Sequence, residues 1–157
     1  MYKKILVAID GSDVADHAFE SALQFAKTEN AELFVLHIIE SPQFYLPEVG
    51  IDPASIYEAL VAEGGHITQH ARDRLKNEGV RGQAGVLDNF LSGHATVDQI
   101  QHMAEEFHAD LIVLGTHGRS GFKRLMLGSV AEAFVRMSTR PVLLIPQRSA
   151  VESSMSA

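Results

Sequence analysis

The chain has 157 residues, of which 46% are hydrophobic and 21% charged, so it can bury the core of one globular domain but hardly of two. Its net charge of −7 argues against an extended nucleic-acid-binding surface, and its lack of cysteine excludes disulfide bonds and thiolate metal sites. No apolar run approaches the ~20 residues that span a bilayer. We therefore expect a single domain over residues 1–147 of a soluble cytoplasmic protein that binds no nucleic acid and is not embedded in a membrane.

Five segments are predicted to be strands, and the first, second and fourth of them have the near-continuous apolar composition of strands that are buried on both faces of a parallel sheet. In the first, KKILVAI, four of the seven residues are Ile, Leu or Val. The five segments are residues 3–9, 31–39, 82–88, 110–115 and 141–146. Strands of this kind require helices on both faces of the sheet.

Between these segments, apolar side chains recur at helical spacing in four places. Gly64 and Gly65 weaken the second helix, which we expect to end near Gly79. The four predicted apolar faces are Val14, Ala18, Ala22 and Phe25; Leu60, Gly64, Ile67, Ala71 and Leu75; Val97, Ile100, Ala104 and Phe107; and Val130, Ala133, Phe134 and Met137. Strands that alternate with helices in this way predict an α/β domain.

Two segments fall outside the alternation. Residues 40–55 contain three prolines and form a connection much longer than the usual ~2–6 residues. This length fits a lid or a contact surface, and it equally fits a surface loop packed by its own aromatic side chains. Residues 148–157 are small and polar, so we expect them to form a disordered tail.

Glycines and cations occur together in residues 115–129, which is unexpected in an acidic chain. Glycine lets backbone N–H groups approach a ligand closely, and cations attract anions, so we infer a phosphate site here. The Walker A pattern and the dinucleotide pattern G-x-G-x-x-G are both missing from the sequence. Instead, Gly115 and Gly118 are followed, after nine intervening residues, by Gly128 and Ser129 at the start of a predicted helix.

This spacing, G-x2-G-x9-G-[ST], resembles the ATP-binding branch of the universal stress protein family. Segments in family order carry the resemblance over nearly the whole domain: KKILVAIDGSD, VLHI, DLIVLGTHGRSG and GSVAEAFVRMSTRPVLLIP. The match is weakest over residues 40–80. The resemblance implies a five-stranded parallel sheet in the order 3-2-1-4-5, with helices on both faces, of the adenine nucleotide alpha hydrolase-like type. It also implies bound ATP, with Mg, and homodimers.

The resemblance further assigns roles to single residues around the topological switch point of such a sheet. Asp10 would bind the ribose hydroxyls and is the candidate for contact with a nucleotide-bound Mg, while the backbone of Ile38 would bind the adenine edge. Gly115, Gly118 and Arg119 would line the phosphate path. Gly128, Ser129 and Val130 would donate backbone N–H groups, and Ser129 its hydroxyl, to phosphate at a helix N-terminus. The implied nucleotide-binding residues are Ala8, Ile9, Asp10, Ser12, Ile38, Leu114, Gly115, His117, Gly118, Arg119, Gly128, Ser129 and Val130.

Several of these residues also fit purely structural roles. Ser129 with Glu132 matches the S-x-x-E capping box, and Asp10 can simply open the turn that precedes the first helix. His117 can contact phosphate either through its imidazole ring or through its backbone alone. The cations Lys123 and Arg124 fit solvated loop charges as well as phosphate ligands.

His66 and His70 stand four residues apart, as a metal-binding pair would. The sequence HITQH lacks the glutamate of H-E-x-x-H, however, and no third ligand is evident. A surface face of the helix is therefore the favoured interpretation, and neither histidine is assigned as a metal ligand.

We expect an ATP-binding regulatory protein whose nucleotide occupancy changes its shape or its partners, in a stress response or at a membrane transporter. No catalytic base can be named, so at most slow ATP hydrolysis is expected. The alternative is an interaction module of the same fold that binds no nucleotide. The apolar strand Val142–Ile145 lies at the implied sheet edge, so we expect it to pair two copies into a homodimer, which the 40–55 connection can extend into a higher oligomer.

Overall fold

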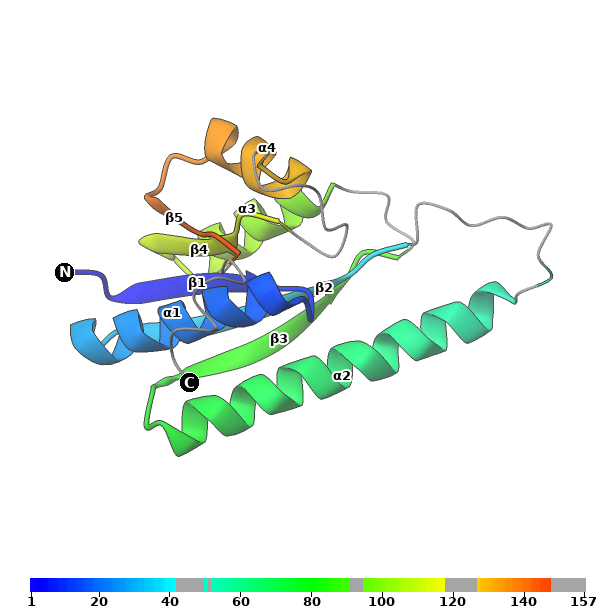
Figure 1. Cartoon of the computed structure of the whole chain (residues 1–157), viewed down its shortest axis with the longest axis horizontal. Coiled ribbons are helices and arrows are strands. Elements are labelled where there is room, and N and C mark those ends of the chain that lie inside the picture. Colours follow the sequence, from blue (N-terminus) through cyan, green and yellow to red (C-terminus); the bar gives the residue numbers. More distant parts are fainter. Residues whose placement is uncertain (42–49, 51, 91–94, 118–126, 148–157) are drawn as a thin grey trace, which may run out of the picture.

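The computed structural model describes residues 1–41, 50, 52–90, 95–117 and 127–147. The described residues form five strands and four helices, which confirms the predicted alternation (Figure 1). In chain order they are β1 (Lys4–Ile9), α1 (Asp13–Glu29), β2 (Glu32–Ile39), α2 (Pro53–Asn77), β3 (Gly82–Asp88), α3 (Thr96–Glu106), β4 (Leu111–Gly115), α4 (Ser129–Met137) and β5 (Val142–Ile145). The predicted tail, 148–157, lies outside the described residues.

The five strands form one parallel sheet in the order β3-β2-β1-β4-β5, which is the order implied by the family resemblance. Strand β1 lies at the centre, with β2 on one side and β4 on the other. After β1 the chain therefore adds β2 and β3 on one side of β1, and it then crosses back to add β4 and β5 on the other side. Ligands of open α/β sheets bind beyond the carboxyl ends of the strands at such a reversal.

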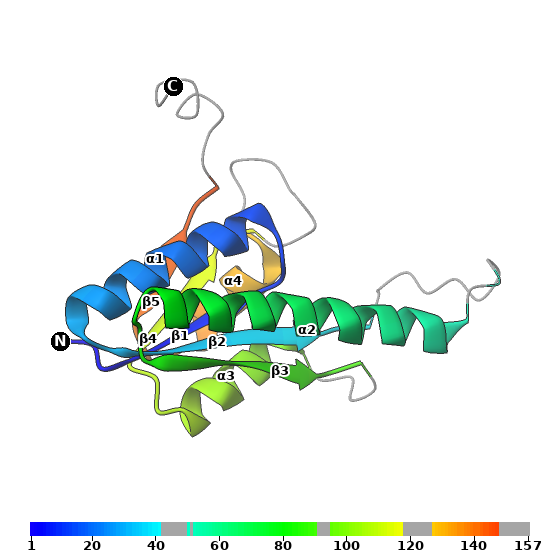
Figure 2. The same ribbon diagram turned by 90° about the horizontal axis from the view of Figure 1, so that it is seen from below.

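Two hydrophobic clusters lie on the two faces of the sheet. One joins the sheet to α1 and α2, through residues such as Leu23 and Leu75. The other joins it to α3 and α4, through Ile100 and the fully buried Phe134. Figure 2 shows α2 and α3 on opposite sides of β2 and β3, so helices cover both faces as expected.

Helix α1 buries most of its predicted face, but Phe25 is 40% exposed, and this part of the prediction is wrong. At 100° per residue, the buried face is centred on Ala15, Ala22 and Ala26, which places Phe25 at its edge. On α4, Ala131 and Phe134 are buried, whereas Met137, the last residue of the helix, is 41% exposed instead of packed.

Helix α2 begins earlier than the sequence suggested and absorbs the end of the expected 40–55 connection. Asp52 is its N-cap, Pro53 occupies the first turn, and Gly79 just beyond its end adopts a φ of +66°. Figure 1 shows its N-terminal half running past the carboxyl end of the sheet. Residues 42–49 and 51 of that connection lie outside the described part.

Candidate functional site

The carboxyl ends of β1 and β4 meet at the centre of the sheet. Val7 pairs with Val113, and both strands end within two residues of that pair. The last apolar side chains, Ile9 and Leu114, are buried, at 7% and 3% exposure. The residues that first become accessible at this edge are therefore those that follow them, Asp10 and Gly115, as the resemblance implied.

Asp10 has a defined structural role in the turn after β1. One of its carboxylate oxygens accepts a hydrogen bond from the Ser12 N–H at 2.9 Å. Gly11 between them has a φ of +80°, a region that side chains disfavour, and Ser12 caps α1 by accepting from Ala15 N–H at 3.2 Å. The turn fixes the Asp10 carboxylate at the sheet edge beside the end of β4.

Gly115 is required by packing inside the protein. A Cβ atom at this position would lie 2.7 Å from Cγ1 of Val14, which is itself only 4% exposed. The close approach of this glycine to a phosphate, which the resemblance implied, stays a prediction beside this packing constraint. The first glycine of the motif is needed because the end of β4 touches the first turn of α1.

Gly128 is constrained in a similar way by the loop's own backbone. Its N–H donates to the carbonyl of Thr116 at 2.7 Å, and a Cβ atom here would lie 3.0 Å from that same oxygen. The Thr116 N–H in turn donates to the carbonyl of Ile145 at the end of β5. These contacts bring the start of α4 back to the carboxyl end of β4.

Ser129 is the first residue of α4, and the capping-box interpretation is wrong. Gly128 is the N-cap, and the helix start has no side-chain cap. The partner expected for the box, Glu132, instead pairs with Arg136 at 2.8 Å. Because the first N–H groups of a helix have no acceptor within it, those of Ser129 and Val130 point toward whatever occupies the helix N-terminus.

The other residues expected near phosphate are placed only in part. His117 lies two residues after the end of β4, with its Nδ1 3.0 Å from the Thr116 hydroxyl. Its buried Nε2 has no hydrogen-bond partner in the described part of the chain. Gly118 and Arg119 lie outside the described residues, as do Lys123 and Arg124. On β2, Ile38 is partly buried and pairs with Leu87 of β3.

His37, the neighbour of Ile38, is a residue that the sequence reasoning missed. It is only 5% exposed, and its Nδ1 lies 3.0 Å from the carbonyl oxygen of Ile9. The available signal was a histidine in the middle of an otherwise apolar strand, AELFVLHII. Such a residue needs a buried hydrogen-bond partner.

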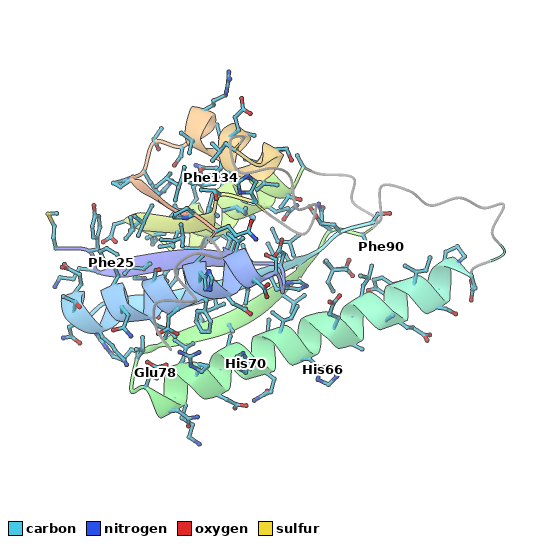
Figure 3. All side chains as sticks on the ribbon, viewed as in Figure 1. Phe25, His66, His70, Glu78, Phe90 and Phe134 are labelled. Atoms are coloured by element: carbon cyan, nitrogen blue, oxygen red, sulfur yellow. The ribbon has the colours of Figure 1, made fainter. Side chains whose placement is uncertain are left out.

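The histidine pair of α2 faces the other side of the turn after β1. His66 and His70 are exposed residues of α2 (Figure 3). They line a cleft of about 280 Å³ between α1 and α2, together with Ile9, Gly11 and Asp16. Among the described residues, no three His, Asp or Glu side chains are arranged to hold a metal ion. In the same part of the chain, no helix is long and apolar enough to cross a membrane.

Charged contacts fix α2 to its neighbours at both ends. Near its C-terminus, Arg74 binds Glu20 of α1 at 2.6 Å and Glu78 at 2.5 Å. The hydrogen bond from Arg74 lowers the pKa of Glu20, and the hydrogen bonds from Lys27 and then Arg74 lower the pKa of Glu78. At the other end, the Tyr57 hydroxyl donates to Asp88 at 2.5 Å, which lowers the pKa of Asp88 and raises that of Tyr57. This second contact holds α2 against the carboxyl end of β3.

Comparison with known proteins identifies close similarities over nearly the full chain. Residues 1–146 match the sequence model described as the Universal stress protein family. The chain is 36% identical to the universal stress protein YxiE of Bacillus subtilis, over 92% of this chain and 99% of that protein. A solved structure from the same family in Burkholderia pseudomallei is similar with a TM-score of 0.75 at 32% identity, and the match covers 93% of this chain and 97% of the other.

Two further solved structures of the same fold contain adenine nucleotides. One is a universal stress protein in complex with cAMP, with a TM-score of 0.66 at 28% identity, covering 92% of this chain and 97% of the other. The second is the universal stress protein from Archaeoglobus fulgidus in complex with dAMP, with a TM-score of 0.63 at 26% identity and coverages of 92% and 98%.

Proposed function

Because the chain belongs to the universal stress protein family, we propose that it binds an adenine nucleotide, ATP with Mg, at the carboxyl ends of β1 and β4. The nucleotide serves regulation: its presence or absence changes the shape of the site and thereby the protein partners that bind. The two relatives in complex with cAMP and dAMP support an adenine nucleotide as the ligand class.

The observation that carries the proposal is the position of the α4 N-terminus. The hydrogen bond from Gly128 N–H to the Thr116 carbonyl holds this helix end beside the end of β4, and β4 pairs with β1. Unpaired N–H groups and the helix dipole both favour an anion at this point. Phosphate groups would bind the N–H groups of Ser129 and Val130 and the Ser129 hydroxyl.

The rest of the nucleotide extends from there across the sheet edge. In our proposal, Asp10 accepts hydrogen bonds from the ribose hydroxyls, and the Ile38 backbone binds the adenine edge. Both residues lie at carboxyl ends of neighbouring strands, β1 and β2, which pair along their length. Gly118 and Arg119 complete the phosphate path.

The side chains present fit a magnesium ion that arrives with the nucleotide. Mg²⁺ prefers oxygen ligands and is commonly bound through one or two carboxylates together with substrate phosphates. Asp10 supplies a carboxylate at this edge, and its orientation is fixed by the Ser12 N–H. Bound there, the ion would neutralise part of the phosphate charge.

We further propose that two copies pair through β5 into a homodimer. Strand β5 is the sheet edge, and all four of its apolar residues remain partly exposed in the single chain. On α4, which packs over the same edge, Val135 and Met137 are 44% and 41% exposed. Apolar side chains and unpaired strand groups at one edge favour a two-fold partner.

The direct test is nucleotide titration of protein from which copurified ligand has been removed. The chain has no tryptophan and three tyrosines, so retained adenine is visible in the ultraviolet spectrum and its removal can be followed. Calorimetric titration with Mg-ATP should then show one site per chain, with GTP binding more weakly. Absence of heat with all adenine nucleotides would favour an interaction module that binds no nucleotide.

A further inference from the structure

His37 is a polar side chain buried beside the proposed nucleotide site, on the opposite face of β2 from Ile38. Among the described residues, three polar side chains are buried: His37, Thr68 and Asn89, at 5%, 1% and 6% exposure. The Thr68 hydroxyl bonds within its own helix, to the carbonyl of Gly64 at 2.9 Å. His37 differs because its side chain joins two strands.

The hydrogen bond of His37 fixes its tautomer. Its Nδ1 lies 3.0 Å from the carbonyl oxygen of Ile9, and a carbonyl oxygen can only accept, so Nδ1 carries the proton and donates. Ile9 is the residue directly opposite His37 in the β1–β2 pairing. The contact therefore adds a side-chain bond to the strand pair at the point where β1 ends.

Helix α2 fixes the same ring from the other side. A Cβ atom on Gly64 would lie 3.0 Å from Cδ2 and 3.4 Å from Nε2 of His37. A glycine in the middle of a 25-residue helix is unfavourable by roughly 0.5–1 kcal/mol relative to alanine, so its presence needs a reason. Room for the imidazole of His37 supplies that reason.

The bond to Ile9 acts on Asp10 through the peptide plane. The carbonyl of Ile9 and the N and Cα atoms of Asp10 lie in one planar unit, so holding the oxygen orients the start of the next residue. The following turn, closed by Asp10 and the Ser12 N–H at 2.9 Å, then directs the carboxylate. His37 also directly precedes Ile38, whose backbone is proposed to bind the adenine edge.

We propose that His37 is a positioning residue of the nucleotide site: its buried Nδ1–H holds the Ile9 carbonyl and so orients Asp10 for the ribose, while Gly64 of α2 leaves space for its ring. This inference rests on the proposed nucleotide function. In this proposal His37 acts through the carbonyl of Ile9 and not by contact with the nucleotide, because its ring lies between that carbonyl and Gly64 of α2.

A matched pair of substitutions separates the hydrogen bond from the shape of the side chain. Asparagine at position 37 places an amide nitrogen where Nδ1 stands, whereas leucine has the same branched shape without a donor. His37→Asn should bind ATP within about twofold of the natural protein, and His37→Leu should bind about tenfold more weakly. Circular dichroism and thermal unfolding establish that each variant is folded at the titration temperature.

A double-mutant cycle with Asp10→Asn tests whether His37 acts through Asp10. Asparagine keeps a side-chain oxygen that can accept the hydrogen bond from the Ser12 N–H. If His37 acts by orienting Asp10, His37→Leu should weaken ATP binding by less than about twofold in the Asp10→Asn background. If His37→Leu weakens ATP binding by the same factor with and without Asp10→Asn, the two residues act independently, and the positioning role is overturned. An unchanged ATP affinity in the folded His37→Leu protein would also overturn it.

A second pair of variants decides the question if His37→Leu does not fold. Gly64→Ala should push the ring away and weaken ATP binding several-fold, whereas Gly65→Ala meets nothing within 4 Å and should leave binding unchanged. Equal ATP affinity in both glycine variants would contradict the inference. If the natural protein, freed of copurified nucleotide, does not bind ATP at all, the proposed function itself is refuted.

Discussion

The Cβ position of Gly115 lies 2.7 Å from Cγ1 of Val14, so the end of β4 and the first turn of α1 are in direct contact. Gly115→Ala should therefore destabilise the fold by about 1–3 kcal/mol through overpacking. Urea unfolding measures this loss. In the background of Val14→Ala, which makes space, the same substitution should have a much smaller effect, and equal effects in both backgrounds would show that the contact is unimportant.

Ser129 offers a way to remove one phosphate donor without damaging the helix. Proline is well tolerated at the first position of a helix, and Gly128 before it already has the extended conformation, φ −62° and ψ 154°, that proline requires. Ser129→Pro removes the N–H and the hydroxyl, whereas Ser129→Ala removes only the hydroxyl. We expect ATP binding to weaken about tenfold or more in the proline variant and less in the alanine variant.

Calorimetric titration of both variants at matched stability checks this prediction. The free energies of unfolding of both variants should differ from that of the natural protein by less than about 0.5 kcal/mol, because the Ser129 side chain is exposed and does not cap the helix. Undiminished ATP affinity in Ser129→Pro would remove the helix N-terminus from the site.

The ion-pair network of Arg74 should make stability depend on pH. Its bond to Glu20, and the bonds of Lys27 and Arg74 to Glu78, hold the pKa values of both carboxyls below 4.5, so the contribution of these bonds is present above that pH and is lost as the pH falls through the lowered values. The side chains of Arg74, Glu20 and Glu78 are partly exposed, at 33%, 43% and 20%, so Arg74→Met should lower the unfolding free energy at pH 7 by only about 0.5–1 kcal/mol.

The measurement is the difference in unfolding free energy between the natural protein and Arg74→Met from pH 7 to pH 3. It should shrink by at least half below pH 4.5, leaving a remainder from the guanidinium over the Phe19 ring. Arg136→Met is the control, because the Arg136 side chain is 78% exposed. A difference for Arg74→Met that stays constant over this range would exclude the carboxylates as its source.

The proposed dimer predicts a position-specific effect of charge. Val135→Glu on α4 places a carboxylate beside the β5 edge, whereas Val61→Glu on α2 adds the same charge at a side chain with similar exposure, 44% and 42%. Sedimentation equilibrium at micromolar concentration should show a dimer for the natural protein and for Val61→Glu, and predominantly monomer for Val135→Glu. A monomeric natural protein would contradict the dimer.

Most of the fold was predictable because strands buried in a parallel sheet appear in the sequence as nearly continuous apolar segments. The order of the strands was not, since pairing between distant segments leaves no trace in local composition; it came from the family resemblance. Contacts between distant elements add two constraints that the sequence did not reveal. The glycine at 115 faces Val14 of α1, and Gly64 faces the ring of His37 on β2, so neither constraint is visible in its own segment.

The candidate site was predictable to a similar degree. The motif spacing located the helix start at Gly128 and Ser129, but it could not distinguish a capping serine from the first helical residue, because that depends on backbone angles. Roles for Asp10 and Ile38 remain predictions. Those for Gly118 and Arg119 concern residues outside the described part of the chain.

The central claim is that the folded protein binds an adenine nucleotide, and thermal unfolding of stripped protein with and without Mg-ATP tests it most directly. At ~100 times its dissociation constant, a ligand that binds only the folded state stabilises it by about 2.7 kcal/mol. For a domain of this size each kcal/mol raises the melting temperature by roughly 2–4 °C, so we expect an increase of roughly 5–11 °C. An identical melting temperature with and without millimolar Mg-ATP would contradict the account.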